Sequence, residues 1–330
     1  MYKSITKSIY SKKYLAIMTN MTDLQIIVPV FNEQEVVDLF YEKMKQVFQT
    51  CDADWTILFV DDGSTDGTVK HIEFLQHKDK RVGYLTLSRN FGKEYALTAG
   101  LDYADAEVVV VIDVDLQDPP ELIPEMLDLW HEGYDVVYAT RNEREGETYM
   151  KKATASWFYR IINSMSKISI PKDTGDYRLM DMKAVRALRK LRESNRFMKG
   201  LFAWVGYKQK AIYFDRKKRV AGSTKWNFRK LFSFAVDGIT SFSYMPLRFA
   251  TWIGVSVALF AFLYGCFIIV KTLIFGNDLP GYPSLMVVIL FLGGIQLMAL
   301  GVIGEYLGRL FEENKRRPLY LIDKFEPPEK

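Results

Sequence analysis

The sequence predicts an α/β domain, in which a mostly parallel sheet is covered by helices on both faces, followed by a two-helix transmembrane hairpin. Three observations support this fold class. Between Asp23 and Thr140, short apolar runs alternate with segments whose apolar residues recur at helical spacing, as in sheets built from repeated strand–helix units. Each apolar run ends in polar residues. From Phe249 onward, two long stretches carry no charge.

The alternating region divides into strands and helices in a regular order. The strands are expected at residues 24–30, 55–60, 82–87, 108–112 and 135–140. The helices are expected at residues 35–48, 65–76, from Lys93 onward, and at 119–130, where prolines open the segment as they often do at a helix start. Ligands of such sheets bind beyond the carboxyl ends of the strands. The residues that follow each strand are therefore the first candidates for a site.

The uncharged stretches 249–270 and 282–304 are each long enough to cross a bilayer core, which needs about 20 residues. Their connector is short, so they should form a hairpin whose ends return to the same side. Basic residues flank the hairpin and are nearly absent from the connector, which places the soluble domain and both termini in the cytoplasm. The two cysteines lie far apart in the sequence, which fits that reducing compartment.

These patterns divide the chain into six parts. They are a basic, mobile tail (1–22), a cytoplasmic α/β domain (23–230), juxtamembrane interfacial helices (231–248), two transmembrane helices (249–274 and 280–306) and a cytoplasmic tail (307–330). The juxtamembrane part mixes basic, aromatic and apolar residues at helical spacing, which favours helices lying in the membrane interface. An ordinary helix packed on the domain is the alternative. The first tail lacks the continuous apolar core of a signal peptide.

Composition and missing motifs disfavour several classes of protein. The formal net charge is only +4, so no nucleic-acid partner is implied. The three histidines show no spacing typical of zinc ligands. No G-x-G-x-x-G follows the first strand and no G-x-x-x-x-G-K-[ST] occurs, which disfavours a Rossmann dehydrogenase and a P-loop NTPase.

Two carboxylates, Asp113 and Asp115, follow the fourth predicted strand directly. A charged turn that keeps the strand end soluble would explain them. Polar residues follow all five strands, however, so a shared site is the better interpretation. Hard oxygen ligands suit Mg²⁺ or Mn²⁺, and Mg²⁺ is usually held by one or two carboxylates together with phosphate oxygens. We therefore expect a metal site for a nucleotide diphosphate at this edge of the sheet.

Five segments in this order resemble glycosyltransferase family 2, whose members have the GT-A fold. They are "IIVPVFNEQE", "FVDDGSTDGT", "LSRNFGKEYAL", "DVDLQDPPE" and "GDYRLMD". Together with "RVAGSTKW" and the hairpin, they resemble the polyisoprenyl-phosphate hexosyltransferases, in particular the bacterial undecaprenyl-phosphate glucosyltransferases. Dolichol-phosphate mannose synthases share the catalytic domain. The resemblance covers residues 23–310.

The resemblance implies a nucleotide-sugar site and a metal site. The residues implied for the nucleotide sugar are Pro29, Phe31, Glu33, Asp61, Arg89, Asp113, Arg219 and Lys225. Asp113 and Asp115 would hold Mg²⁺ or Mn²⁺, with Gln117 as a further oxygen ligand. Two alternatives stay open: Arg89 as a plain surface arginine, and the basic loop of Arg219 and Lys225 as a contact to anionic lipid.

The resemblance also implies an acceptor site and catalytic residues. The lipid phosphate would contact Arg141, Lys152, Ser156 and Arg178, although Lys152 stands where relatives carry Arg. Asp176 and Asp115 are the implied catalytic residues. Asp176 matches the position often interpreted as the base, but a lipid phosphate is already largely ionised. Asp176 could instead orient the nucleophile or bind a sugar hydroxyl, or it could be a loop residue that caps the following helix.

The implied reaction is inverting transfer of glucose from UDP-glucose to undecaprenyl phosphate at the cytoplasmic face of a bacterial plasma membrane. Another donor on the same scaffold is the first alternative: GDP-mannose, a UDP-aminosugar or UDP-4-formamido-arabinose. A non-catalytic membrane scaffold is the alternative from another class. A processive polysaccharide synthase is disfavoured because no Q-x-x-R-W motif occurs. Glycines in the second span leave a homo-oligomer open.

Overall fold

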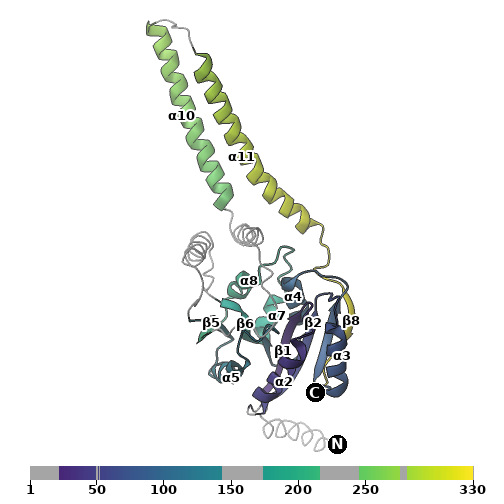
Figure 1. Cartoon of the computed structure of the whole chain (residues 1–330). Coiled ribbons are helices and arrows are strands. Elements are labelled where there is room, and N and C mark those ends of the chain that lie inside the picture. Colours follow the sequence, from purple (N-terminus) through teal and green to yellow (C-terminus); the bar gives the residue numbers. More distant parts are fainter. Residues whose placement is uncertain are drawn as a thin grey trace, which may run out of the picture.

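The computed structural model describes residues 22–49, 51, 53–142, 174–215, 245–275 and 281–329. The predictions for the first tail, for Lys152, Ser156, Arg219 and Lys225, and for most of the juxtamembrane segment lie outside these residues. The described chain forms an α/β domain and a long helical hairpin that extends away from it (Figure 1).

One eight-stranded sheet forms the centre of the domain, with the order β7-β5-β6-β4-β1-β2-β3-β8. The strands are β1 (Thr22–Val30), β2 (Ala53–Asp61), β3 (Val82–Leu87), β4 (Val108–Val111), β5 (Val136–Arg141), β6 (Thr174–Asp181), β7 (Gln209–Phe214) and β8 (Ile322–Glu326). Of the strands in the described residues, only β6 and β8 run against the common direction of the others. The prediction of a mostly parallel sheet is confirmed.

Helices cover both faces of the sheet, as predicted. On one face lie α2 (Val37–Phe48), α3 (Thr68–Lys78) and α5 (Ile123–His131), which follows the short 3-10 helix η1 (Pro120–Leu122). On the other face lie α4 (Lys93–Tyr103), α7 (Met182–Leu188) and α8 (Met198–Trp204). All four residues of β4 are fully buried between these layers, which is why the strand is a continuous run of valine.

The structure excludes one alternative for Asp176, that of a loop residue capping the following helix. That residue does not lie in a capping loop, because it belongs to β6. The cap of α7 is Asp181, whose Oδ1 accepts a hydrogen bond of 2.8 Å from the backbone N–H of Lys183. A carboxylate at this position satisfies one of the free N–H groups at a helix start.

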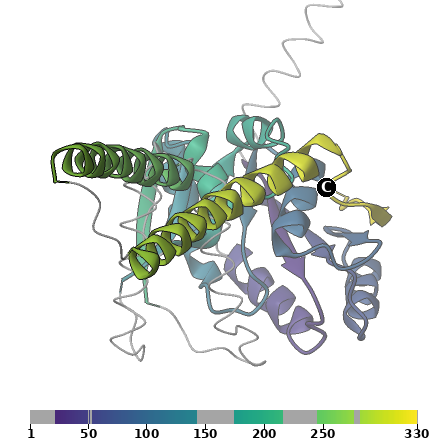
Figure 2. The ribbon, with the colours of Figure 1, turned by 90° about the horizontal axis from the view of Figure 1, so that it is seen from above.

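The hairpin consists of α10 (Met245–Phe275) and α11 (Tyr282–Asn314), which contact each other and diverge toward the α/β domain (Figures 1 and 2). Both helices are long and apolar enough to cross a membrane. Their large apolar side chains are mostly exposed; Leu273, for example, is 81% exposed. A continuous apolar surface of this kind needs a cover, and a lipid bilayer would provide one.

The C-terminal residues differ from the expected tail. Helix α11 continues to Asn314, roughly two turns beyond the predicted end at 306. Residues 322–326 then form β8, which pairs antiparallel with β3 and covers that edge of the sheet. The chain therefore returns from the hairpin into the α/β domain.

Candidate active site

The antiparallel pairing of β4 with β6 brings two distant carboxylates together. Val111 at the end of β4 pairs with Arg178 in β6. Asp113 comes two residues after Val111, just beyond the end of β4. Asp176 comes two residues before Arg178, within β6. Both carboxylates therefore lie at the carboxyl edge of the parallel strands, the edge at which sheets of this kind bind ligands.

Lys93, the first residue of α4, joins these two carboxylates. Its Nζ lies 2.7 Å from Asp113 Oδ1 and 2.7 Å from Asp176 Oδ2. The side chain of Asp176 is only 10% exposed, whereas that of Asp113 is 33% exposed. The ammonium group marks the point on which the two carboxylates converge, so a positive charge is stabilised there.

Lys93 lies within "LSRNFGKEYAL", one of the segments that carry the family resemblance, but it was not among the predicted site residues. A lone lysine at a helix start is usually a surface residue. The one available signal was its position after the third predicted strand, at the edge that also receives Asp113.

Charges around Asp176 keep it ionised. Burial alone would raise the pKa of Asp176, but Lys93, Lys199 and Arg178 outweigh burial and hold that pKa well below its usual range. Partial burial likewise acts to lower the pKa of Lys93, but the carboxylates of Asp113 and Asp176 outweigh it and raise that pKa. The result is a fixed ion pair at neutral pH.

Glu94 follows Lys93 and has the opposite character. Burial, and next the charge of Asp176, raise the pKa of Glu94 to about 7. Its Oε2 accepts a hydrogen bond of 2.9 Å from the backbone N–H of Met198, the first residue of α8. Glu94 was not among the predicted site residues. It connects the site to α8.

Arg178 is buried beneath the start of β6. Its Nε donates to the carbonyl of Asp176 at 3.2 Å and its Nη2 to the carbonyl of Gly175 at 2.9 Å. The guanidinium also stacks on the ring of Phe202, 3.6 Å from its centroid. Burial lowers the pKa of Arg178 to about 10. These contacts hold the backbone on either side of Asp176 in place.

Asp115 and Gln117 lie in a tight turn after β4. The backbone N–H of Gln117 donates to Asp115 Oδ1 at 3.1 Å, and Leu116 between them has a positive φ of 56°. Both side chains are half-buried. Among the described residues, no group of three or more His, Cys, Asp or Glu is arranged to hold a metal alone. One or two carboxylates completed by substrate oxygens are typical of Mg²⁺ bound to a nucleotide, so these residues fit such an ion.

Arg141 lies at the end of β5, beside the start of β6. Thr140 pairs with Thr174, and a Cβ built on Gly175 would lie 3.8 Å from Arg141 Nη2 and 3.9 Å from Asp118 Oδ2. Arg141 Nε is buried and has no hydrogen-bond partner among the described residues. An arginine with a free donor beside Gly175, the residue before Asp176, is available to an anionic group.

The first two strands bring the predicted nucleoside residues together. Val30 pairs with Asp61, which places Pro29, Phe31 and Glu33 next to the end of β2. Asp61 is 2% exposed; its Oδ2 accepts from the backbone N–H of Ser64 at 3.0 Å. Its Oδ1 is buried and has no partner among the described residues. Burial raises the pKa of Asp61, against the hydrogen bonds from Ser64. A buried carboxylate oxygen without a donor suits an N–H or O–H group of a ligand.

Asp62 and Arg89 have local partners in the same region. Asp62 accepts hydrogen bonds from the backbone N–H groups of Phe91, at 2.7 Å, and Gly92, at 2.9 Å. Arg89 is exposed; its guanidinium donates to the carbonyl of Asn90 at 2.9 Å and stacks on Phe91. Asp62 therefore fixes the loop before α4, although it was not among the predicted site residues.

Two family models match the sequence. The model described as "Glycosyl transferase family 2" matches residues 25–189, and the model described as "GtrB C-terminal hairpin" matches residues 245–310. The two matches correspond to the α/β domain and to the helical hairpin.

Curated relatives match nearly the whole chain. A protein of Synechocystis sp., described as an uncharacterized glycosyltransferase, is 52% identical over 91% of this chain and 94% of its own length. The prophage bactoprenol glucosyl transferase homolog of Escherichia coli is 46% identical over 91% of this chain and 98% of its own length. The bactoprenol glucosyl transferase of Shigella phage SfV is also 46% identical, over 91% of this chain and 97% of its own.

Similarity to solved structures is weaker. Glucosyl-3-phosphoglycerate synthase from Mycobacterium tuberculosis, in complex with Mn²⁺, UDP and glucosyl-3-phosphoglycerate, matches with a TM-score of 0.44 and 16% sequence identity. The match covers 65% of this chain and 76% of that one.

Proposed function

Because the chain belongs to glycosyltransferase family 2, we propose that it transfers glucose from UDP-glucose to a polyisoprenyl phosphate, such as undecaprenyl phosphate. The observation that carries this proposal is the convergence of Asp113, Asp176 and Lys93 at the carboxyl edge of the sheet. The choice of glucose and of a polyprenyl acceptor is supported by the two relatives named as bactoprenol glucosyl transferases, or homologs of one, at 46% identity.

The donor would bind across the ends of β1, β2 and β4. Asp61 would accept a hydrogen bond from the nucleoside, because its buried Oδ1 has no partner among the described residues. Pro29, Phe31 and Glu33 would line the same pocket. The diphosphate would then lie toward Asp113 and Asp115, where the ammonium group of Lys93, held between Asp113 and Asp176, adds positive charge. Arg89, Arg219 and Lys225 complete the proposed donor site.

A divalent cation, Mg²⁺ or Mn²⁺, fits Asp113, Asp115 and Gln117 together with the diphosphate oxygens. When bound, it would neutralise negative charge on the departing UDP. The protein's own contribution is to hold the carboxylates in position. Lys93 keeps the Asp113 carboxylate at the edge, and the turn around Leu116 fixes Asp115.

In the proposed reaction, an oxygen of the lipid phosphate attacks the anomeric carbon of glucose from the face opposite the diphosphate. The new carbon–oxygen bond forms as the bond to UDP breaks, and UDP departs with the bonding electron pair. The anomeric configuration therefore inverts, and an α-linked donor gives a β-linked lipid sugar. Arg141, with Lys152 and Ser156, would attract and orient the acceptor phosphate. Arg178 is buried, so it would contribute its positive charge from beneath Asp176.

Asp176 is better suited to orient groups than to remove a proton. Its neighbouring cations hold its pKa well below the usual range, so the carboxylate is a weak base at neutral pH. An ionised lipid phosphate needs no base. We propose that Asp176 holds Lys93 and contacts a hydroxyl of the sugar with its second oxygen, Oδ1, which is buried and without a partner among the described residues.

The hairpin would keep the enzyme in the membrane that contains its acceptor. Both termini and the α/β domain are proposed to face the cytoplasm of a bacterial cell, where nucleotide sugars are made. Confinement to one membrane shortens the search between enzyme and lipid. It also limits the acceptor to a phosphate at the level of the lipid headgroups.

Donor competition tests the proposed substrate. Purified full-length protein is given radiolabelled UDP-glucose and undecaprenyl phosphate, with a tenfold excess of unlabelled UDP-glucose, GDP-mannose, UDP-N-acetylglucosamine or UDP-4-formamido-arabinose. The proposal expects only unlabelled UDP-glucose to suppress labelled product strongly. Stronger suppression by another sugar nucleotide would assign the enzyme to that donor instead. Binding of no nucleotide sugar at all would favour a non-catalytic scaffold.

A further inference from the structure

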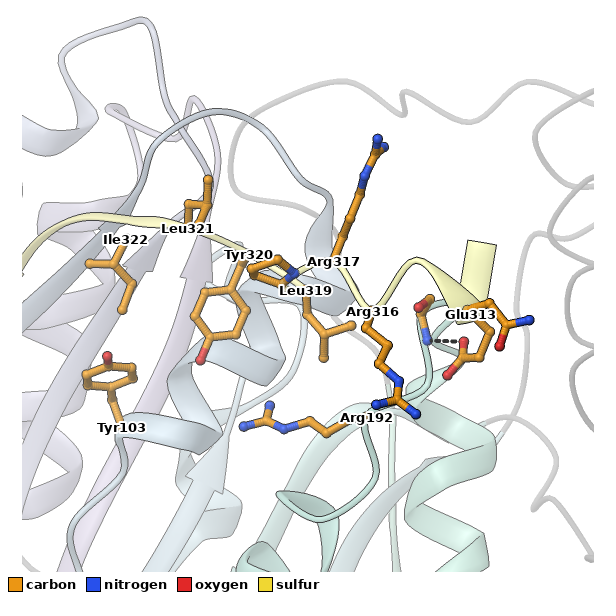
Figure 3. Close-up of a pocket in the computed structure, with 12 residues that line it drawn as sticks. Tyr103, Arg192, Glu313, Arg316, Arg317, Leu319, Tyr320, Leu321 and Ile322 are labelled. Atoms are coloured by element: carbon orange, nitrogen blue, oxygen red, sulfur yellow. Dashed lines mark hydrogen bonds between the residues drawn. The ribbon is translucent and has the colours of Figure 1, made fainter. Parts of the chain in front are cut away.

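The segment that follows the hairpin is joined to the α/β domain by several kinds of contact. We call residues 313–326 the C-terminal strap. It contains the last two residues of α11, the connection 315–321 and strand β8. Figure 3 shows how its side chains gather near Arg192 and Tyr103, around a cavity of about 810 Å³.

The first contact joins the end of α11 to a loop of the domain. Glu313 Oε2 accepts a hydrogen bond of 2.8 Å from the backbone N–H of Ser194 (Figure 3). The carbonyl of the same Ser194 accepts from the hydroxyl of Tyr95 in α4 at 2.7 Å. A membrane helix is thus linked to α4 through one loop residue.

The second contact joins the connection to the other end of α4. The hydroxyl of Tyr320 donates to Asp102 Oδ2 at 2.7 Å, and Arg192 Nη1 lies 2.6 Å from the same oxygen. The side chain of Asp102 is 7% exposed. The ring of Phe325 in β8 packs edge-on against Tyr103, with 4.8 Å between the ring centroids. A largely buried carboxylate shared by two donors is a strong local anchor.

The third contact is the sheet itself. Strand β8 pairs with β3, and the backbone N–H of Ser88 donates to the carbonyl of Leu321 at 2.9 Å. Lys324 in β8 also forms an ion pair of 3.1 Å with Glu73 in α3. This last contact ties the strap to a different helix, which makes Lys324 a useful control.

Helix α4 connects the strap to the proposed active site. Lys93 at its first position contacts Asp113 and Asp176, while Asp102 near its other end contacts the strap. The helix has 11 residues and is therefore about 16 Å long. A straight helix of this length moves as one rigid element, so anchoring it at the strap also anchors Lys93.

We propose that the C-terminal strap is a positioning element that holds the active site at a fixed height and orientation over the membrane. This inference rests on the proposed function, because it assumes an acceptor confined to the bilayer. If only the pairing of β8 with β3 held the strap, the connection 315–321 would let the domain sample more orientations relative to α11. The fraction of time in which the site faces the lipid phosphate would fall, and with it the effective concentration of acceptor.

Two acceptors separate positioning from general stability. One is undecaprenyl phosphate in phosphatidylcholine vesicles, and the other is a short, water-soluble isoprenyl phosphate. The first variant is Tyr320→Phe, which removes the hydrogen bond to Asp102. The second is a double variant that combines Tyr320→Phe with Glu313→Gln, and its second change weakens the contact to Ser194. The control is Lys324→Gln, which removes an ion pair in the same strap that does not involve α4.

The double variant should lose about tenfold in kcat/KM for the vesicle-bound acceptor, a part of the roughly 100- to 10,000-fold gain that tethering can provide. Its kcat/KM for the soluble acceptor, its KM for UDP-glucose and its melting temperature should stay near those of the wild type. Lys324→Gln should resemble the wild type with both acceptors.

An equal loss with both acceptors would overturn the proposal, because it would indicate a structural role for the strap. Unchanged activity of the double variant with vesicles would also overturn it. If the wild type transferred glucose to neither acceptor, the proposed function itself would fail and the positioning role with it. The behaviour of the wild type therefore distinguishes the two failures.

Discussion

The ammonium group of Lys93 lies 2.7 Å from the carboxylate of Asp176, although the two residues are far apart in the sequence. The pair links α4 on one face of the sheet to the start of β6 at the carboxyl edge. Because Asp113 shares the same lysine, the loss of one partner should disturb the other two.

Replacing Lys93 by methionine should reduce glucosyl transfer by about 100-fold or more, the usual effect of removing one group that stabilises developing charge. The variant should also lose about 1–3 kcal/mol in the free energy of unfolding, because Asp176 stays buried without its donor. Transfer assays and denaturant unfolding in detergent measure the two effects. Lys70→Met, on the exposed side of α3, is the control and should behave like the wild type. Full activity of Lys93→Met would contradict the role of the pair.

Replacing Asp113 by asparagine should abolish transfer while leaving the fold intact. The amide keeps the shape of the side chain but loses the charge that a divalent cation requires. The activity of purified protein is measured with radiolabelled UDP-glucose over a range of Mg²⁺ concentrations. Asp54→Asn, an exposed position at the opposite end of β2, is the matched control. Near-wild-type turnover by Asp113→Asn would refute the metal assignment.

Asp61 and Asp62 are neighbours with different expected roles. Asp61→Asn should weaken UDP binding about tenfold or more, a loss of roughly 1.5–3 kcal/mol for a charged hydrogen bond, with little change in melting temperature. Asp62→Asn should mainly lower the melting temperature, because Asp62 holds the backbone of Phe91 and Gly92. Calorimetric titration with UDP and thermal unfolding separate the two effects. The assignment of Asp61 to the nucleoside pocket fails if both variants bind UDP like the wild type.

Glu94 should give the folded protein a specific pH dependence. Its pKa is raised from 4.5 to about 7, so the folded state binds more protons than the unfolded state between these values. The contribution of this group to stability therefore falls as the pH rises from 4.5 through 7. Glu94→Gln removes that loss and can still accept from Met198. We expect the melting temperature of Glu94→Gln minus that of the wild type to be larger at pH 8 than at pH 5. A constant difference across this range would contradict the raised pKa.

The parallel part of the sheet was predictable from sequence because β1 to β5 follow the alternation of apolar runs and amphipathic segments. The carboxyl-edge location of Asp113 and Asp61 follows from that order alone. The position of Asp176 near Asp113 was not predictable in the same way. Asp176 reaches the edge through an antiparallel pairing between distant segments, and β6 carries charged residues within its own length.

Two further features were hidden for physical reasons. Strand β8 is a short edge strand with polar residues, "IDKFE", whose pattern differs little from that of a loop. Lys93 has no distinctive spacing, and its importance comes from tertiary contacts with two separate strand ends. The family resemblance named the segment around Lys93, but only the fold brings that residue to Asp176.

Formation of a lipid-linked sugar tests the central claim most directly. Purified full-length protein is reconstituted in phosphatidylcholine vesicles that contain undecaprenyl phosphate, and is given UDP-glucose labelled in the sugar, with Mg²⁺ or with chelator. The account predicts one labelled, lipid-soluble product per UDP released, with a β-anomeric linkage by NMR, only when Mg²⁺ is present. Release of UDP without lipid-linked glucose, or an α-linked product, would contradict it.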